Sequence, residues 1–145
     1  MKLVIQRVSS ASVTVDKKVV GSIGKGYFVL LGVSGDDNED IAEKLAEKLI
    51  KLRVMSDEND KMNLDLKTAD GEVLVVSQFT LYADTSGGNR PSFIKAGEPA
   101  KAKAIYDLFI NRLREEGFKV ATGEFGSYMD IKANLDGPVT IILEQ

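Results

Sequence analysis

The sequence contains neither histidine nor cysteine among its 145 residues, and these two absences exclude much enzyme chemistry. A Ser-His-Asp or Cys-His triad cannot form within the chain, and zinc sites built on Cys and His ligands are excluded as well. No disulfide can form either, which fits a reducing compartment. Any catalysis must therefore use backbone donors, hydroxyls, amides, carboxylates, Arg or Lys, or a group of the substrate itself.

Long apolar runs are also missing. The longest uninterrupted apolar stretches span only four or five residues, whereas a membrane-spanning helix needs roughly 20. The first eight residues, Met1 to Val8, have the pattern of a strand broken by charge and lack the apolar core of a signal peptide. We therefore expect a cytoplasmic protein without a membrane partner.

An excess of basic charge is absent too. The chain carries 19 basic and 22 acidic residues, a net charge of −3. Proteins that grip duplex nucleic acid through many phosphates are usually basic. We therefore expect neither a DNA partner nor an extended nucleic-acid footprint, although a pocket that captures a short nucleic-acid end is compatible with this charge.

Two loops partly match known ligand-binding motifs, but the details of their sequences do not support ligand binding. The glycine-rich segment 21–26 lacks the Walker A spacing and lies between strands, so a hairpin turn is favoured. The acidic segment 57–61 begins like a calcium loop, but Lys61 cannot coordinate and Thr68 occupies the closing position. We interpret it as a solvated turn and expect no metal and no cofactor.

The length fits one domain, residues 1–145, and the hydrophobic pattern predicts an α+β fold. The first helix begins at Asp37 or Asn38, and the second begins at Pro99 and ends near Gly117. A long loop, 84–97, is of the kind that is usually functional or disordered. The expected strands are 2–15, 19–24, 27–33, 73–76 running on through 81, 118–122, 128–135 and 139–143.

Polar residues follow the buried strand at 73–76. On a continuing strand, Gln78 and Thr80 share one face, and Ser77 and Phe79 share the other. Such groups either satisfy neighbouring backbone or line a ligand crevice, and the pattern alone favours the first role. Thr80 would be a poor nucleophile because no imidazole is present to act as its base.

Two further segments draw attention. The long loop contains Arg90-Pro91-Ser92-Phe93, in which Arg90 suits an anion and Phe93 suits either a base or the core. Gly137-Pro138 precedes the last strand and has the pattern of a plain turn, since only about 5–6% of such bonds are cis in folded proteins.

Taken together, six segments resemble the D-aminoacyl-tRNA deacylase family, also called D-tyrosyl-tRNA(Tyr) deacylase, over essentially the whole chain. They are Gln6-Arg7-Val8, Gly24-Lys25-Gly26, Lys61-Met62-Asn63-Leu64, Ser77-Gln78-Phe79-Thr80-Leu81, Arg90-Pro91-Ser92-Phe93 and Asp136-Gly137-Pro138-Val139-Thr140. Three positions depart from the usual pattern of the family: Leu135, Asp60 and Tyr82.

The resemblance implies an enzyme that hydrolyses the ester of D-aminoacyl-tRNA, and in many members that of mischarged glycyl-tRNA, while rejecting L-aminoacyl-tRNA. It implies a homodimer with a mixed, mostly antiparallel, barrel-like sheet and two main helices, acting on the acceptor end of tRNA. Each subunit would insert a cis Gly137-Pro138 dipeptide into its partner's site, with Arg7 holding the dipeptide. The resemblance assigns the catalytic floor to Ser77, Gln78, Phe79 and Thr80, and the adenosine wall to Phe125 and Met129.

Our mechanistic hypothesis places the backbone N–H groups of Phe79 and Thr80 around the developing oxyanion, with the ribose 2′-hydroxyl helping the attacking water. The rival is Thr80 as a covalent acyl acceptor. Two interpretations from other classes stay open at this point. One is a non-catalytic RNA-binding module that uses Phe79, Arg90 and Phe93, and the other is a structural, oligomer-forming domain.

Overall fold

A computed structural model describes residues 1–145 of the chain. Its helices are α1 (Glu39–Ile50), α2 (Pro99–Glu115) and the 3-10 turn η1 (Phe79–Tyr82). Its strands are β1 (Lys2–Val15), β2 (Lys18–Ile23), β3 (Gly26–Gly32), β4 (Met55–Ser56), β5 (Met62–Leu64), β6 (Glu72–Ser77), β7 (Val120–Thr122) and β8 (Asp130–Glu144).

Six strands form one mixed sheet in the order β2-β1-β3-β6-β7, and β8 pairs along the other edge of β1. β1 runs antiparallel to β2, β3 and β8, whereas β6 runs parallel to β3 and β7. β2 and β7, at the two ends of this order, approach each other closely, because a Cβ on Gly21 of β2 would lie 2.3 Å from the Thr122 carbonyl oxygen of β7. The sheet is therefore a nearly closed barrel, which confirms the expected α+β fold with two main helices.

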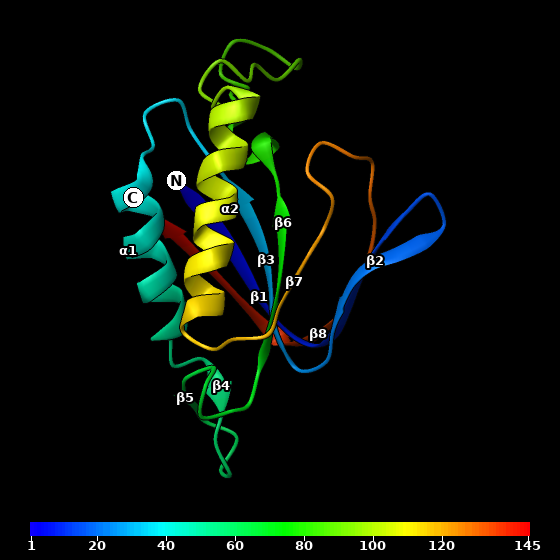
Figure 1. Cartoon of the computed structure of the whole chain (residues 1–145), viewed down its shortest axis with the longest axis vertical. Coiled ribbons are helices and arrows are strands. Elements are labelled where there is room, and N and C mark those ends of the chain that lie inside the picture. Colours follow the sequence, from blue (N-terminus) through cyan, green and yellow to red (C-terminus); the bar gives the residue numbers. More distant parts are fainter.

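The two helices lie side by side on one face of this sheet (Figure 1). Their apolar stripes, centred on Leu45 and Leu49 in α1 and on Phe109 and Leu113 in α2, are buried in the main core. β3 is buried on both faces, which explains its continuous apolar run. Neither helix is long and apolar enough to cross a bilayer.

The predicted helix ends are confirmed, with one choice resolved. Asn38 is the N-cap of α1 and accepts a hydrogen bond from the Ile41 N–H at 3.1 Å. Asp37 is instead buried and accepts from the Met1 ammonium group at 2.5 Å. Gly117 follows α2 with a φ of +88°, a left-handed conformation that glycine adopts without a steric penalty.

The hairpin turn expected at 21–26 is wrong. β2 and β3 each pair antiparallel with β1 and not with each other, so residues 24–25 form a bend between two strands of the same direction. The solvated turn at 57–61 is present, and its Asp57 carboxylate accepts from the N–H groups of Asn59 and Lys61. This turn joins β4 to β5, a short antiparallel hairpin that the polar sequence of 56–71 did not predict.

The predicted strand through residue 81 is wrong. β6 ends at Ser77, and the chain turns into η1 at Phe79. The reason is a loss of partners, because the pairing of β6 with β3 stops at Ser77 and its pairing with β7 stops at Val75. Consequently, the proposed sharing of strand faces by Gln78 and Thr80 does not occur.

The end of the chain differs as well. The two strands predicted around Gly137-Pro138 are one strand, β8, and the dipeptide lies inside it with a cis peptide bond. The plain turn expected from the local pattern is therefore wrong, whereas the cis bond implied by the family resemblance is confirmed. The register between β1 and β8 shifts at this point, around Arg7, so β8 accommodates the dipeptide as an irregularity.

Candidate active site

A cavity of about 700 Å³ opens where β3 and β6 end and α2 begins. The residues that line it come from five separate segments of the chain. They are Val33, Val76, Ser77, Gln78, Phe79, Phe93, Ala96, Gly97, Glu98, Pro99, Ala102, Phe125, Gly126, Ser127, Tyr128, Met129 and Ile131. Its volume falls within the range typical of small-ligand sites.

The floor of this pocket is the point where the buried strand β6 ends. Ser77 and Gln78 are half-buried there, while the Phe79 side chain remains 55% exposed. The Phe79 ring packs edge-on against Phe93 from the long loop, with ring centroids 5.0 Å apart. The long loop thus contributes one wall of the pocket, although its Arg90 is not among the lining residues.

The opposite wall carries Phe125 and Met129. Phe125 packs at 5.8 Å from the ring of Tyr106 on α2, whose hydroxyl donates to the Val75 carbonyl at 2.8 Å. Burial of Tyr106 raises its pKa, so this hydroxyl keeps its proton and the hydrogen bond. Both family-derived wall residues therefore line the pocket on a wall that is tied to β6.

Two backbone N–H groups at the start of η1, directly after the end of β6, have no acceptor within the chain. The Gln78 N–H donates to the Leu31 carbonyl at 2.7 Å, but the N–H groups of Phe79 and Thr80 open η1 and remain unpaired. The Thr80 hydroxyl accepts from the Gln78 amide nitrogen at 2.5 Å and is not part of the pocket lining. The Phe79 N–H belongs to a residue that lines the pocket, and the Thr80 N–H follows it at the start of η1; donors of this kind stabilise an oxygen that gains negative charge.

The pocket has little acid–base chemistry of its own. Glu98 is its one carboxylate, and it caps α2 by accepting from the N–H groups of Ala100 and Lys101. The lining contains no Lys or Arg. A reaction here would therefore depend on backbone donors, on water and on groups that the ligand brings.

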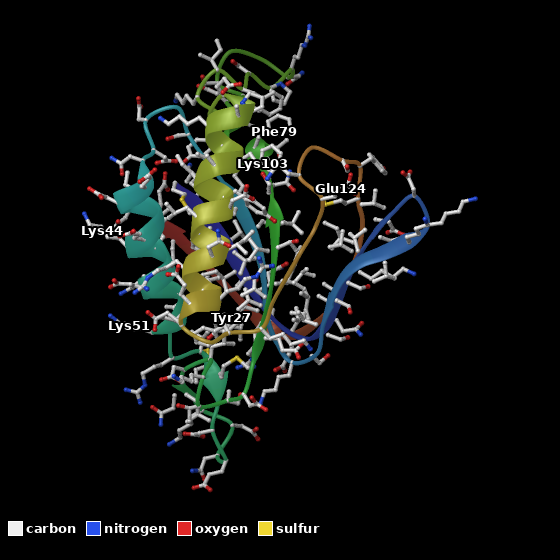
Figure 2. All side chains as sticks on the ribbon, in the orientation of Figure 1. Tyr27, Lys44, Lys51, Phe79, Lys103 and Glu124 are labelled. Carbon is white, nitrogen blue, oxygen red and sulfur yellow. The ribbon has the colours of Figure 1, made fainter.

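The remaining predicted site residues lie at the other end of the sheet. Through the strand pairings, Arg7 is level with Val73 of β6, four residues before Ser77, a separation of about 13 Å along the strand alone. Figure 2 shows Phe79 near the start of α2 and Tyr27, the partner of Arg7 on β3, near the other end of this helix. Gly137 and Pro138 are exposed beside Arg7 and do not line the pocket.

The structure thus brings Ser77, Gln78 and Phe79 together with Phe125 and Met129, and it separates Arg7, Gly137 and Pro138 from them. Sequence reasoning missed several lining residues: Glu98, Pro99, Ala102, Ser127 and Tyr128. The one local signal was the position of the second helix directly after a long loop. Tyr128 had no signal, because its 95% exposure at the rim depends on the fold of the whole segment.

Comparisons with known proteins agree over the whole chain. The profile of the family described as D-Tyr-tRNA(Tyr) deacylase matches residues 4–144. A protein of Dehalococcoides mccartyi named D-aminoacyl-tRNA deacylase is 56% identical over 144 residues, which cover 99% of this chain and 94% of the relative.

Two solved structures are similar as well. The one described as the c-Myc DNA Unwinding Element Binding Protein superposes with a TM-score of 0.93 at 40% identity, covering 100% of this chain and 99% of the other. A second, described as a probable eukaryotic D-amino acid tRNA deacylase, has a TM-score of 0.86 over 98% of this chain and 97% of its own. Its identity of 16% makes this second likeness one of fold alone.

Proposed function

The chain belongs to the D-Tyr-tRNA(Tyr) deacylase family, and from this membership we propose that it is a D-aminoacyl-tRNA deacylase, a hydrolase that releases a free D-amino acid and tRNA in the cytoplasm. The observation that supports this activity best is the pocket at the end of β6, which Phe79 lines, together with the N–H groups of Phe79 and Thr80 that open η1 without acceptors. These donors lie beside an apolar cavity that holds no imidazole or thiol, in a chain that contains neither group.

The proposed reaction needs little from the protein because an aminoacyl ester is already activated. Water attacks the ester carbonyl, and the new C–O bond places negative charge on the carbonyl oxygen, which the two N–H groups stabilise. The ester C–O bond to the ribose then breaks, and the ribose oxygen takes the proton that water loses. The neighbouring ribose hydroxyl orients the water, and Thr80 orients the Gln78 amide through their hydrogen bond.

The exposed aromatic rings at the rim suit a single-stranded RNA end. Phe79, Phe93 and Tyr128 all present ring surface to solvent, and bases of unpaired nucleotides stack on such rings. With a net charge of −3, the chain is poorly suited to a long phosphate track. We therefore propose the acceptor end of tRNA as the ligand and not a DNA duplex.

The stereochemical selection, in this proposal, comes from a second copy of the chain. Gly137 and Pro138 are exposed and lie far from their own pocket, so they are free to enter the pocket of a partner in a homodimer. Their carbonyl oxygens would accept hydrogen bonds from the substrate's α-ammonium group. The side chain of an L-amino acid would then clash with the dipeptide, whereas a D side chain would point to solvent. Glycine has no side chain and would be accepted as well.

A deacylation assay on matched D- and L-aminoacyl-tRNA tests the activity directly. We expect catalytic amounts of protein to turn over the D ester and glycyl-tRNA and to leave the L ester intact. Stoichiometric binding without turnover would instead establish an RNA-binding module. Absence of binding would leave only the structural, oligomer-forming domain.

Subunit mixing tests the origin of the selective dipeptide. Ala102 lines the pocket, so Ala102→Trp should fill it and abolish turnover in its own chain. Gly137→Ala should leave the pocket intact but impair the dipeptide. When the two variants are co-expressed, the intact pocket of the Gly137→Ala chain meets the intact dipeptide of its partner. We therefore expect hydrolysis of the L ester to fall as Ala102→Trp chain is added, and unchanged L hydrolysis would show a dipeptide that acts within its own chain.

A further inference from the structure

Arg7 connects the selective dipeptide to a distant part of the chain. Its side chain is nearly buried, with 8% exposure. On one side, its Nε atom donates to the Asp136 carbonyl oxygen and lies 3.1 Å from an Asp136 carboxylate oxygen. On the other side, its Nη1 atom donates to the Val54 carbonyl at 2.8 Å and to the Ser56 hydroxyl at 3.1 Å. The guanidinium group therefore bridges β8 and β4.

The hydrogen bond from Arg7 to the Asp136 carbonyl fixes the peptide plane between Asp136 and Gly137. The Asp136 carbonyl belongs to the peptide that enters Gly137, so fixing this oxygen fixes the orientation in which the dipeptide begins. The carboxylate of the same residue pairs with the same guanidinium nitrogen, and a planar guanidinium allows little rotation once it is held on two sides. Asp136 thus grips Arg7 through both its main chain and its side chain.

The contact with β4 supplies the fixed side of the bridge. Met55, between Val54 and Ser56, is completely buried in the main core. The preceding segment is tied to β3 because the Tyr27 hydroxyl donates to the Leu52 carbonyl. The hairpin that follows is closed by the Asp57 carboxylate, which accepts from two N–H groups of its own turn. β4 is therefore a rigid support against which Arg7 can hold β8.

We propose that Asp136 and Ser56 are positioning residues that set the selectivity for D over L esters, acting through Arg7 on the orientation of Gly137-Pro138. This inference deepens the proposed function and rests on it. Neither residue touches the pocket, so each influences the reaction only by limiting the movement of the dipeptide that a partner receives. A dipeptide that moves would admit an L side chain, whereas the pocket that hydrolyses the ester would be unaltered.

The test compares kcat/KM for matched D- and L-aminoacyl-tRNA in two variants. Asp136→Asn removes a charge-assisted contact and should lower the D-to-L ratio about tenfold, because such bonds contribute more than neutral ones. Ser56→Ala removes one neutral hydrogen bond and should lower the ratio about threefold. Both changes lie near the surface of the fold, and thermal unfolding establishes that each variant remains folded.

Two matched controls break comparable contacts elsewhere. Asp107→Asn removes the ion pair with Lys103 on α2, and Ser9→Ala removes a hydroxyl that donates to the Asn134 carbonyl on the same strand β8. Neither contact involves Arg7, so both controls should keep the D-to-L ratio of the unsubstituted chain. A general loosening of the protein would lower the ratio in the controls as well and would overturn the proposal.

The decisive measurement is non-additivity. If Asp136 and Ser56 act through Arg7, then in an Arg7→Lys background neither Asp136→Asn nor Ser56→Ala should lower the ratio further, since Lys lacks the fork that bridges the two strands. Full additive effects in that background, or an unchanged ratio in the single variants, would overturn the inference. Failure of the proposed function would look different, because the unsubstituted chain itself would then not hydrolyse the D ester.

Discussion

The two ends of the β-sheet are built on opposite plans. The end near Phe79 is hollow and mostly apolar, and its polar lining comes from Ser77, Gln78, Ser127 and the capping carboxylate of Glu98. At the end near Arg7, a nearly buried guanidinium group holds two strands together. In the proposed function, this difference matches two demands: cleavage of the ester needs space and hydrogen-bond donors, whereas selection of its stereochemistry needs rigidity.

The largest expected effect on selectivity comes from substituting Gly137, at the rigid end of the sheet. Gly137 has a φ of +151°, and a Cβ there would lie 2.3 Å from the Val139 nitrogen, so Gly137→Ala must displace the backbone. We expect the D-to-L ratio of kcat/KM to fall roughly 10- to 100-fold, as strain of a few kcal/mol allows. Hydrolysis of the D ester should persist, because the pocket end is untouched. An unchanged ratio would mean that the dipeptide does not select.

A smaller effect is expected at the hollow end from Thr80→Ala. If the backbone N–H groups stabilise the oxyanion, the variant loses only the hydrogen bond from Gln78 and should retain turnover within about tenfold. A covalent acyl acceptor would instead be indispensable, and its removal would lower kcat by several orders of magnitude. Single-turnover kinetics with D-aminoacyl-tRNA distinguish the two mechanisms.

The stability of the two ends can be compared at alkaline pH. Burial raises the pKa of Tyr27, beside Arg7, to about 12, and burial also raises the pKa of Tyr82, in η1, to about 12. A raised tyrosine pKa means that the folded state favours the neutral phenol. The corresponding stability is therefore complete below pH 10 and is lost as the pH rises towards 12.

Urea unfolding between pH 9 and pH 12 measures this loss. Tyr27→Phe should cost about 1 kcal/mol at neutral pH, because it removes the hydrogen bond to the Leu52 carbonyl, and should flatten the alkaline decline. Tyr82→Phe is the matched variant for the hollow end. A decline of the same slope in Tyr27→Phe and in the unsubstituted chain would contradict the assignment.

The smallest effect concerns salt. If only the acceptor end of tRNA enters the hollow end, few phosphates are contacted, and the slope of log K against log salt should be about −2 or shallower. The measurement is KM for D-aminoacyl-tRNA at increasing salt concentration. Direct binding to the inactive Ala102→Trp variant cannot replace it, because the Trp side chain fills the pocket. A steep slope would reveal a phosphate track along the rest of the surface.

Much of the fold could be predicted because it depends on local patterns. The apolar stripes of both helices, the N-cap at Asn38 and the stop at Gly117 all reflect interactions within a few residues. The predictions of strand ends were wrong where pairing with strands distant in the sequence decides the structure. β6 ends because neighbouring strands stop pairing with it, and β8 continues through Gly137-Pro138 because β1 pairs with it on both sides of the dipeptide.

The sequence by itself determined the chemistry that is possible, since a chain without histidine and cysteine must rely on backbone donors, hydroxyls, amides, carboxylates, Arg, Lys or the substrate. Its motifs determined the family. Only the tertiary structure decided where these groups lie. It gathered Phe79, Phe125 and Met129 around one cavity and placed Gly137 at the far end of the sheet, held by Arg7. The physical reason is that spacing along a chain sets which residues share a strand or a helix face, whereas strand pairing and packing between remote segments set which of them meet.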